Sequence, residues 1–454
     1  MAHARKIYFL AALGYLLFVV YGSLVPLDFQ PRSLDAALRD FYQVHYLKLG
    51  VESRADWVAN ILLYIPLAYL WLGGLAREGR LLQQVCSTIA VFCFCVALSL
   101  AIEFTQQFFP PRTVSLNDLF AELLGTTIGL VLWWTTEQRL RRLCASVMSQ
   151  GRSAAYAGSV LYSTVYLVFS LFPFDFLVSA EEIRKKVAGD YFAWLPSSSR
   201  CGVGIRCGVK LIAEAAAVAP LGFLLSLVSY KEGLTLIKSG ARIGFWLGLA
   251  IESLQFFLAS GVSLATSVLT RVVGVAGGAA AGELLRRVHP WPLLYLFAPW
   301  VPFAAACYIA LLFAVNFSGN GPLLNFHQGL DRLSEIYFMP FYYHYYTSES
   351  VAVNSVISVS IMFFPSGILF WVRRVVRIRE FVARGAFQAG LASALLAVLL
   401  ESGKLFFRAT RPDPTNVIIA AAAGAMGYLV ISTCTRASLN VALPTEDPAA
   451  SQTL

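Results

Sequence analysis

The chain has 454 residues, of which 58% are hydrophobic and 13% are charged. Soluble globular domains are about 45–50% apolar and about 25% charged, so the composition excludes a soluble globular protein and indicates a polytopic membrane protein. The net charge of +9 does not indicate a nucleic-acid partner, because the basic residues fall in short segments between apolar runs, where they set membrane topology.

The apolar runs predict the transmembrane helices in chain order. The first run, residues 7–25, is too long for the hydrophobic region of a signal peptide and no small-residue cleavage pattern follows it, so we expect an uncleaved span. Further runs long enough to cross about 30 Å of hydrocarbon as helices fall at residues 57–75, 83–104, 117–135, 157–174, 209–230, 239–258, 266–284, 294–315, 353–372, 385–405 and 414–432. The expected fold class is therefore all-α, a polytopic membrane protein with about twelve transmembrane helices.

The predicted spans form three similar groups of four. The segments IEFTQQFFPPRTVSLNDLFAELLGTTIG, IESLQFFLASGVSLATSVLTRVVGVAGG and LESGKLFFRATRPDPTNVIIAAAAGAMG align without a gap, and their glutamates Glu103, Glu252 and Glu401 are spaced by 149 residues each time. Equal spacing of so rare an intramembrane residue indicates internal repeats. We predict three tandem repeats followed by a disordered cytoplasmic tail, at residues 1–150, 151–292, 293–438 and 439–454.

The loops predict the orientation of the chain. Lys and Arg are denser in the short loops after the even-numbered spans, as in RLRR at residues 139–142, and such loops stay on the cytoplasmic side. Both termini are therefore expected to be cytoplasmic. The long loops after the first span of each repeat, rich in aromatic residues, are expected to face outward as short interfacial pieces, acting either as membrane anchors or as a lid over a substrate. The sequence leaves open whether Cys201 and Cys207 form a disulfide in one of them.

Six polar residues of the first predicted repeat fall at one side of the membrane: Asp56, Asn60, Glu103, Gln106, Arg112 and Asp118. The first two are one turn apart at the start of the second span, where they share a helix face. The next two end the third span, the arginine lies in the following loop, and the last carboxylate begins the fourth span, which suits a helix N-terminus. Such ends meet in an up-down bundle, so we expect these side chains to form one outward-facing polar pocket.

These residues also carry a resemblance to a known family. DWVANILLYIPLAYL followed by IEFTQQFFPPRTVSLNDLFAELLGTTIG resembles the VanZ-like family of bacterial membrane proteins, whose pattern is roughly D-x-x-x-[NH], E-x-x-Q, an Arg, an Asp and two glycines. The family usually has Asn where this chain has Glu122. The resemblance is strong over residues 8–136 and weak beyond, where Gly261 and Ser267 replace the Arg and the Asp of the motif. It implies a cell-envelope role in the bacterial cytoplasmic (inner) membrane, and the family's founding member is associated with low-level teicoplanin resistance.

Two interpretations of the polar cluster remain open. It is either a set of interhelix bonds that fixes packing, or a site for an anionic ligand, since intramembrane ionisable groups are functional candidates by default. The favoured function is binding or processing of an anionic membrane lipid or lipid-linked envelope precursor, with Arg112 holding phosphate; no reaction is assigned. The alternatives are a non-catalytic scaffold with membrane-protein partners and, less favoured, a transporter. We expect no cofactor and no metal, because no nucleotide-binding motif or metal-ligand spacing occurs.

Overall fold

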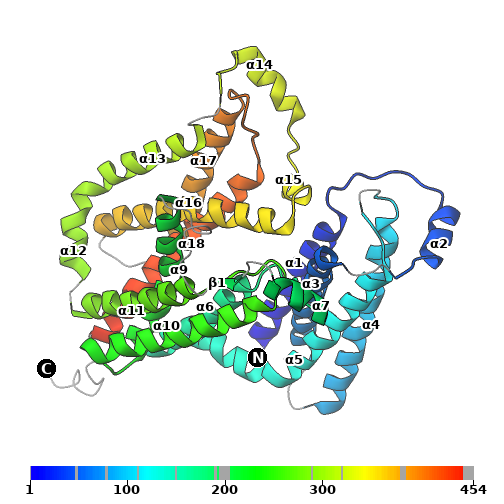
Figure 1. The fold of residues 1–454 in the computed structure, drawn as a ribbon, viewed down its shortest axis with the longest axis horizontal. Coiled ribbons are helices and arrows are strands. Elements are labelled where there is room, and N and C mark those ends of the chain that lie inside the picture. The colour runs from blue at the N-terminus through cyan, green and yellow to red at the C-terminus, as the bar shows by residue number, and fades with distance from the viewer. Residues whose placement is uncertain are drawn as a thin grey trace. The chain divides into compact units, whose positions relative to one another are not determined.

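The chain is almost entirely helical in its computed structural model (Figure 1), which describes residues 2–46, 50–76, 80–109, 112–148, 151–188, 192–193, 205–287, 290–317, 321–378 and 385–442. In these ranges the only strands are two residues long, β1 (Phe192–Ala193) and β2 (Ser263–Leu264), which pair in parallel. The all-α class is therefore confirmed. Cys201 and the predicted tail from residue 443 onward lie outside the described residues.

The chain divides into two compact units, and the first consists of Met1–Ala145, Val168–Leu195 and Ile251–Leu264. Its helices are α1 (Ala2–Leu24), α2 (Leu34–Tyr42), α3 (Val51–Leu75), α4 (Leu81–Gln106), most of α5 (Leu116–Met148) and α7 (Ala180–Ala188), together with the end of α10 (Gly233–Phe256). Helices α1, α3 and α4 pack around a core that includes Tyr64, Leu67 and Val91.

The second unit consists of Ser146–Leu167, Pro196–Ala250 and Ala265–Leu454. Most of α6 (Arg152–Ser170) and α10 belongs to it, and its other elements are α9 (Ile205–Val228), α11 (Ala265–Arg287), α12 (Pro290–Phe297), η1 (Ala298–Trp300), α13 (Val301–Phe317), α14 (Phe326–Asp331), η2 (Arg332–Glu335), α15 (Tyr342–Tyr345), α16 (Glu349–Ile378), α17 (Ala386–Lys404) and α18 (Thr415–Ala442). Here α11 packs along α9, and α18 packs along α16 and α17.

Eleven helices of the described residues are long and apolar enough to cross a membrane, against about twelve expected. The difference is α6, which occupies the place of the predicted span at residues 157–174 but does not qualify by composition. Its sequence, RSAAYAGSVLYSTVYLVFS, carries four serines, a threonine and three tyrosines, whose polar groups lower its mean hydropathy. Helix α18 continues to Ala442, so the first residues of the predicted tail are helical.

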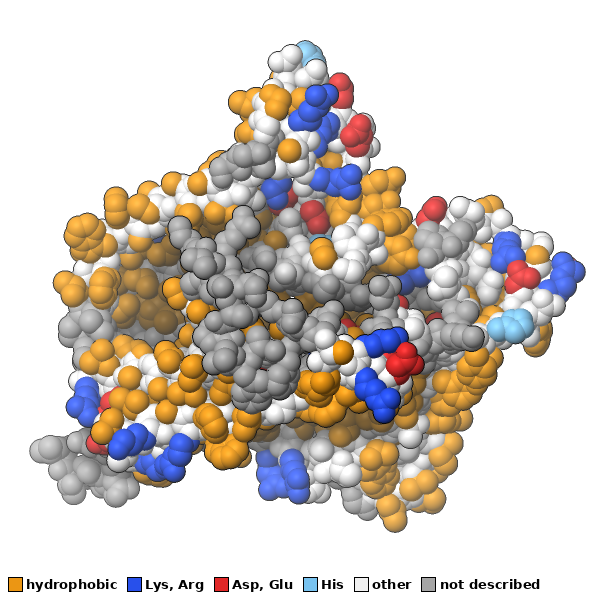
Figure 2. Space-filling view, in the orientation of Figure 1, with side chains coloured by type: hydrophobic (Ala, Val, Ile, Leu, Met, Phe, Trp, Pro, Cys, Tyr) orange, Lys and Arg blue, Asp and Glu red, His pale blue; other side chains and the backbone are white. Residues whose placement is uncertain are grey.

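Large hydrophobic side chains cover much of the outward surface of the long helices (Figure 2). Leu17, Leu82 and Trp246, for example, are 72%, 78% and 65% exposed. Apolar surface on this scale is not left in contact with water by a soluble monomer. The helices are therefore those of a multi-pass membrane protein.

Glycines let the spans of each unit approach closely. Gly125 of α5 lies against the backbone carbonyl of Ile61 in α3, and Gly129 lies against that of Ile65, so closely that a Cβ atom would overlap each oxygen. In the second unit, Gly278 of α11, at the position corresponding to Gly129, lies in the same way against a carbonyl of α9. Small residues allow this backbone contact between membrane helices.

The three predicted repeats share one further backbone contact. In each, an amide of the loop after the first predicted span donates a hydrogen bond, 2.8 Å long, to a carbonyl at the end of the third predicted span. The three bonds are Gln30 to Phe108, Leu177 to Phe257, and Leu324 to Phe406. The donors recur at intervals of 147 residues and the acceptors at intervals of 149.

The close approach of α5 to α3 predicts the effect of adding one methyl group. Gly125→Ala should lower the free energy of unfolding by about 1–3 kcal/mol, because the backbone of Ile61 must shift to admit a Cβ. Gly14→Ala is the matched control, since nothing lies within 4 Å of its Cβ position, and it should be neutral or stabilising by helix propensity. Denaturant unfolding in detergent micelles measures both, and equal stability of the two variants would contradict the packing.

Candidate functional site

A buried glutamate lies at the corner between α4 and α5. Glu103 lies in the last turn of α4 and is 2% exposed. The backbone amide of Ser115, just before α5, donates a hydrogen bond to its carboxylate, while its Oε2 has no hydrogen-bond partner among the described residues. Because a buried carboxylate is costly unless it is bonded, this contact fixes the end of the loop against α4.

The other two glutamates of the predicted repeats are held in the same way. Oε2 of Glu252 accepts the amide of Leu264 at 2.7 Å, and Oε2 of Glu401 accepts the amide of Asp413 at 2.8 Å. In all three places the donor follows the glutamate by twelve residues. The glutamate is thus a loop anchor wherever it occurs.

A second contact ties α3 to the start of α5. Nδ2 of Asn60 donates to Oδ1 of Asp118 at 2.8 Å, and Oγ of Ser115 donates to Oδ2 at 2.6 Å. The amide of Asp118 donates back to Oγ of Ser115 at 3.3 Å, as at a capped helix N-terminus. Both oxygens of Asp118 are therefore engaged.

Two further predicted residues bind the end of α1. Nε2 of Gln106 donates to the carbonyl of Ser23 at 2.8 Å, and Nη2 of Arg112 donates to the carbonyl of Gly22 at 2.6 Å. The last carbonyls of a helix lack partners within the helix, and a cation there is favourable. These side chains consequently join α1 to the α4–α5 corner.

A polar pocket of about 720 Å³ opens beside this corner. Two arginines, one histidine and one aspartate lie among its polar lining residues, which are Gln30, Arg32, Asp40, Gln43, His45, Gln106, Gln107, Arg112 and Thr113. Arg32 forms an ion pair with Asp40 and donates to Oε1 of Gln107 at 3.2 Å. Arginines and amide groups arranged in this way suit an anion with several oxygens.

The six predicted residues divide between the pocket and its supports. Gln106 and Arg112 line the pocket, Asn60 and Asp118 bond to each other, and Glu103 is buried, where it interacts electrostatically with Asp118 and Arg112. The sixth, Asp56, is exposed on α3 one turn before Asn60. The sequence does not predict the other polar residues of the pocket, among them Arg32 and His45. These two lie in the long loop after α1, whose conformation no periodic pattern predicts.

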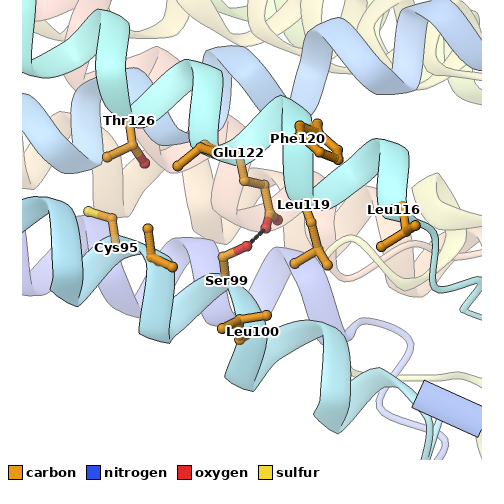
Figure 3. Close-up of a pocket in the computed structure, with 10 residues that line it drawn as sticks. Cys95, Ser99, Leu100, Leu116, Leu119, Phe120, Glu122 and Thr126 are labelled. Atoms are coloured by element: carbon orange, nitrogen blue, oxygen red, sulfur yellow. Dashed lines mark hydrogen bonds between the residues drawn. The ribbon is translucent and has the colours of Figure 1, made fainter. Parts of the chain in front are cut away.

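An apolar groove of about 210 Å³ lies between α4 and α5 (Figure 3). Glu122, 3% exposed, accepts a hydrogen bond from Oγ of Ser99 across this groove. Ser99 was also missed, although it precedes Glu103 by one turn and so shares its helix face. In the described part of the chain, no three His, Cys, Asp or Glu side chains gather as metal ligands would.

In the other two predicted repeats, a cation of the loop occupies the end of the third span. Lys186 of α7, 6% exposed, donates to the carbonyls of Gln255 and Leu258. Arg332 of η2 donates to the carbonyl of Phe407 at 2.7 Å and also to the carbonyls of Lys404, Leu405 and Thr410. The carbonyls at this position of the three predicted repeats, those of Phe109, Leu258 and Phe407, each also accept the backbone amide three residues further on.

Comparison with known proteins finds one family match, in the first part of the chain. Residues 7–137 match the family model described as VanZ/LLP1. No curated protein and no solved structure matches the chain. The matched range runs from α1 into α5 and contains all six predicted site residues. In this part, the chain is similar to the VanZ-like family.

Proposed function

We propose that the polar pocket binds the phosphate-bearing headgroup of an anionic envelope lipid or lipid-linked envelope precursor. The observation that carries this proposal is the position of Arg112 on the wall of a pocket of about 720 Å³, among amide side chains and Arg32. A guanidinium group can bind two phosphate oxygens at once through parallel hydrogen bonds. No reaction is assigned to the site.

The same proposal gives the three parts of the chain different roles. Three tandem VanZ-like repeats, at residues 1–150, 151–292 and 293–438, would share one loop anchor, the glutamate that accepts an amide twelve residues later. Lys186 and Arg332 close the second and third copies from within. In the first copy, the polar pocket lies beside this corner and would hold the ligand.

The proposed site faces outward from the bacterial inner membrane, and both termini are cytoplasmic. The density of Lys and Arg in short loops supports this orientation. A link to teicoplanin resistance rests on the family resemblance alone, and it requires a lipid-linked precursor of the cell wall as the ligand.

The orientation can be tested with two cysteines at the ends of α5. Thr113→Cys, in a chain whose only other cysteine is the exposed native Cys144, should react with a membrane-impermeant maleimide added outside intact cells. Cys144 should react only after lysis, because 31 residues of mostly helical chain, about 46 Å, separate the two positions. Labelling of Cys144 from outside would reverse the orientation and place the pocket in the cytoplasm.

Substitutions of Arg112 test whether the pocket binds an anionic lipid. Arg112→Lys keeps the charge but loses the paired hydrogen bonds, so it should weaken binding of phosphatidylglycerol nearly as much as Arg112→Ala does. Charged hydrogen bonds contribute about 1.5–3 kcal/mol, which predicts a loss of about 10- to 100-fold in affinity. Native mass spectrometry of the protein in phosphatidylcholine nanodiscs with added phosphatidylglycerol measures this affinity.

Arg39→Ala is the matched control, because Arg39 is exposed on α2 and is not among the residues that line the pocket. It should bind phosphatidylglycerol as the parent chain does. If Arg112→Ala binds equally well, or if Arg39→Ala loses as much affinity, the proposed function is wrong.

One observation favours a second candidate, a scaffold without a ligand. Arg112 and Gln106 already bind the carbonyls of Gly22 and Ser23, so they can fix α1 to the corner by themselves. A scaffold predicts that Arg112→Ala lowers the midpoint of thermal unfolding with no change in phosphatidylglycerol affinity. The lipid-binding proposal predicts a change in affinity in protein that remains folded.

A further inference from the structure

The groove between α4 and α5 has the lining of a hydrocarbon site. Its apolar walls are Val96 and Leu100 from α4, and Leu116, Leu119, Phe120 and Leu123 from α5 (Figure 3). Leu100 and Phe120 are 45% and 50% exposed, so the groove is open along one side. Its volume of about 210 Å³ suits part of one chain.

The loop that lines the polar pocket also contacts residues that line the groove. His45 lines the pocket, and its carbonyl accepts the amide of Leu116, which lines the groove, at 3.5 Å. The ring of the next residue, Tyr46, stacks on Phe120 with centroids 5.6 Å apart. His45 and Tyr46 therefore connect the loop of the pocket to Leu116 and Phe120 of the groove.

We infer that this groove holds a hydrocarbon chain of the lipid whose headgroup occupies the polar pocket. The inference rests on the proposed function and adds the second half of the ligand. From Leu116 to Thr126 the groove follows ten residues of α5, about 15 Å, into the membrane-spanning part of the helix. The contact between the pocket loop and the groove is what distinguishes this hydrocarbon chain from the lipids that surround any membrane protein.

The polar pair within the groove is compatible with this occupant. Glu122 and Ser99 bond to each other, so a hydrocarbon chain laid beside them leaves that hydrogen bond intact. Thr126 and Cys95 line the groove beyond them (Figure 3). The chain shields the Glu122–Ser99 bond from water, which strengthens it.

Photocrosslinking tests the inference in the whole protein. The probe is phosphatidylglycerol with a diazirine near the end of one acyl chain, present as a minor component of phosphatidylcholine nanodiscs. Adducts should map to residues 95–126, and unlabelled phosphatidylglycerol should compete them away. Leu123→Trp, which fills the groove, should reduce these adducts to the level given by a phosphatidylcholine probe. Leu124→Trp is the matched control, because Leu124 is exposed and is not among the lining residues, and it should leave the adducts unchanged.

Val96→Trp, from the opposite wall, serves as a second variant if Leu123→Trp does not fold, as judged by thermal unfolding. Adducts that are as strong with the phosphatidylcholine probe, or that persist in both filled variants, would mean surrounding lipid only and overturn the inference. If phosphatidylglycerol binding still depends on Arg112 in that case, the proposed function stands without the groove. If Arg112→Ala leaves binding unchanged, the proposed function fails as well.

Discussion

The structure depends on the hydrogen bond that a backbone amide donates to a glutamate at the end of an apolar helix. A buried charge in a membrane span needs partners, and Glu103, Glu252 and Glu401 each take a backbone amide twelve residues further on. This bond sets the length and path of the loop between two spans. In the first unit it brings Ser115, the cap of α5, against α4, and so determines where Arg112 and Asp118 can lie.

The three predicted repeats differ in what their loop cations bind. Lys186 and Arg332 bind carbonyls that follow the third span of the second and third predicted repeats. In the first predicted repeat an arginine of the loop, Arg112, lines a pocket and binds the end of α1. The VanZ-like pattern is complete in this part of the chain, where the pocket is open.

The sequence predicts the helices and the glutamate spacing well, because long apolar runs and a rare buried charge are strong patterns. The sequence also predicts that Asn60 and Asp118 lie close together, since each lies near the start of a predicted span at the same side of the membrane. It does not predict that the partner of Glu103 is a backbone amide, because any residue can supply one. The sequence does not predict Arg32 and His45 as pocket residues, because the loop segments that carry them have no hydrophobic periodicity. It predicts a transmembrane span at α6, because the serines and tyrosines of that helix lie within an otherwise apolar run.

The most direct measurement of the central claim is an experimental density map of the protein purified with its native lipids. We predict headgroup density in the polar pocket within hydrogen-bond distance of the Arg112 guanidinium group, beside Arg32 and Gln106. A map that shows ordered lipids elsewhere on the spans but only water in this pocket, with Arg112 on the carbonyl of Gly22 alone, would contradict it.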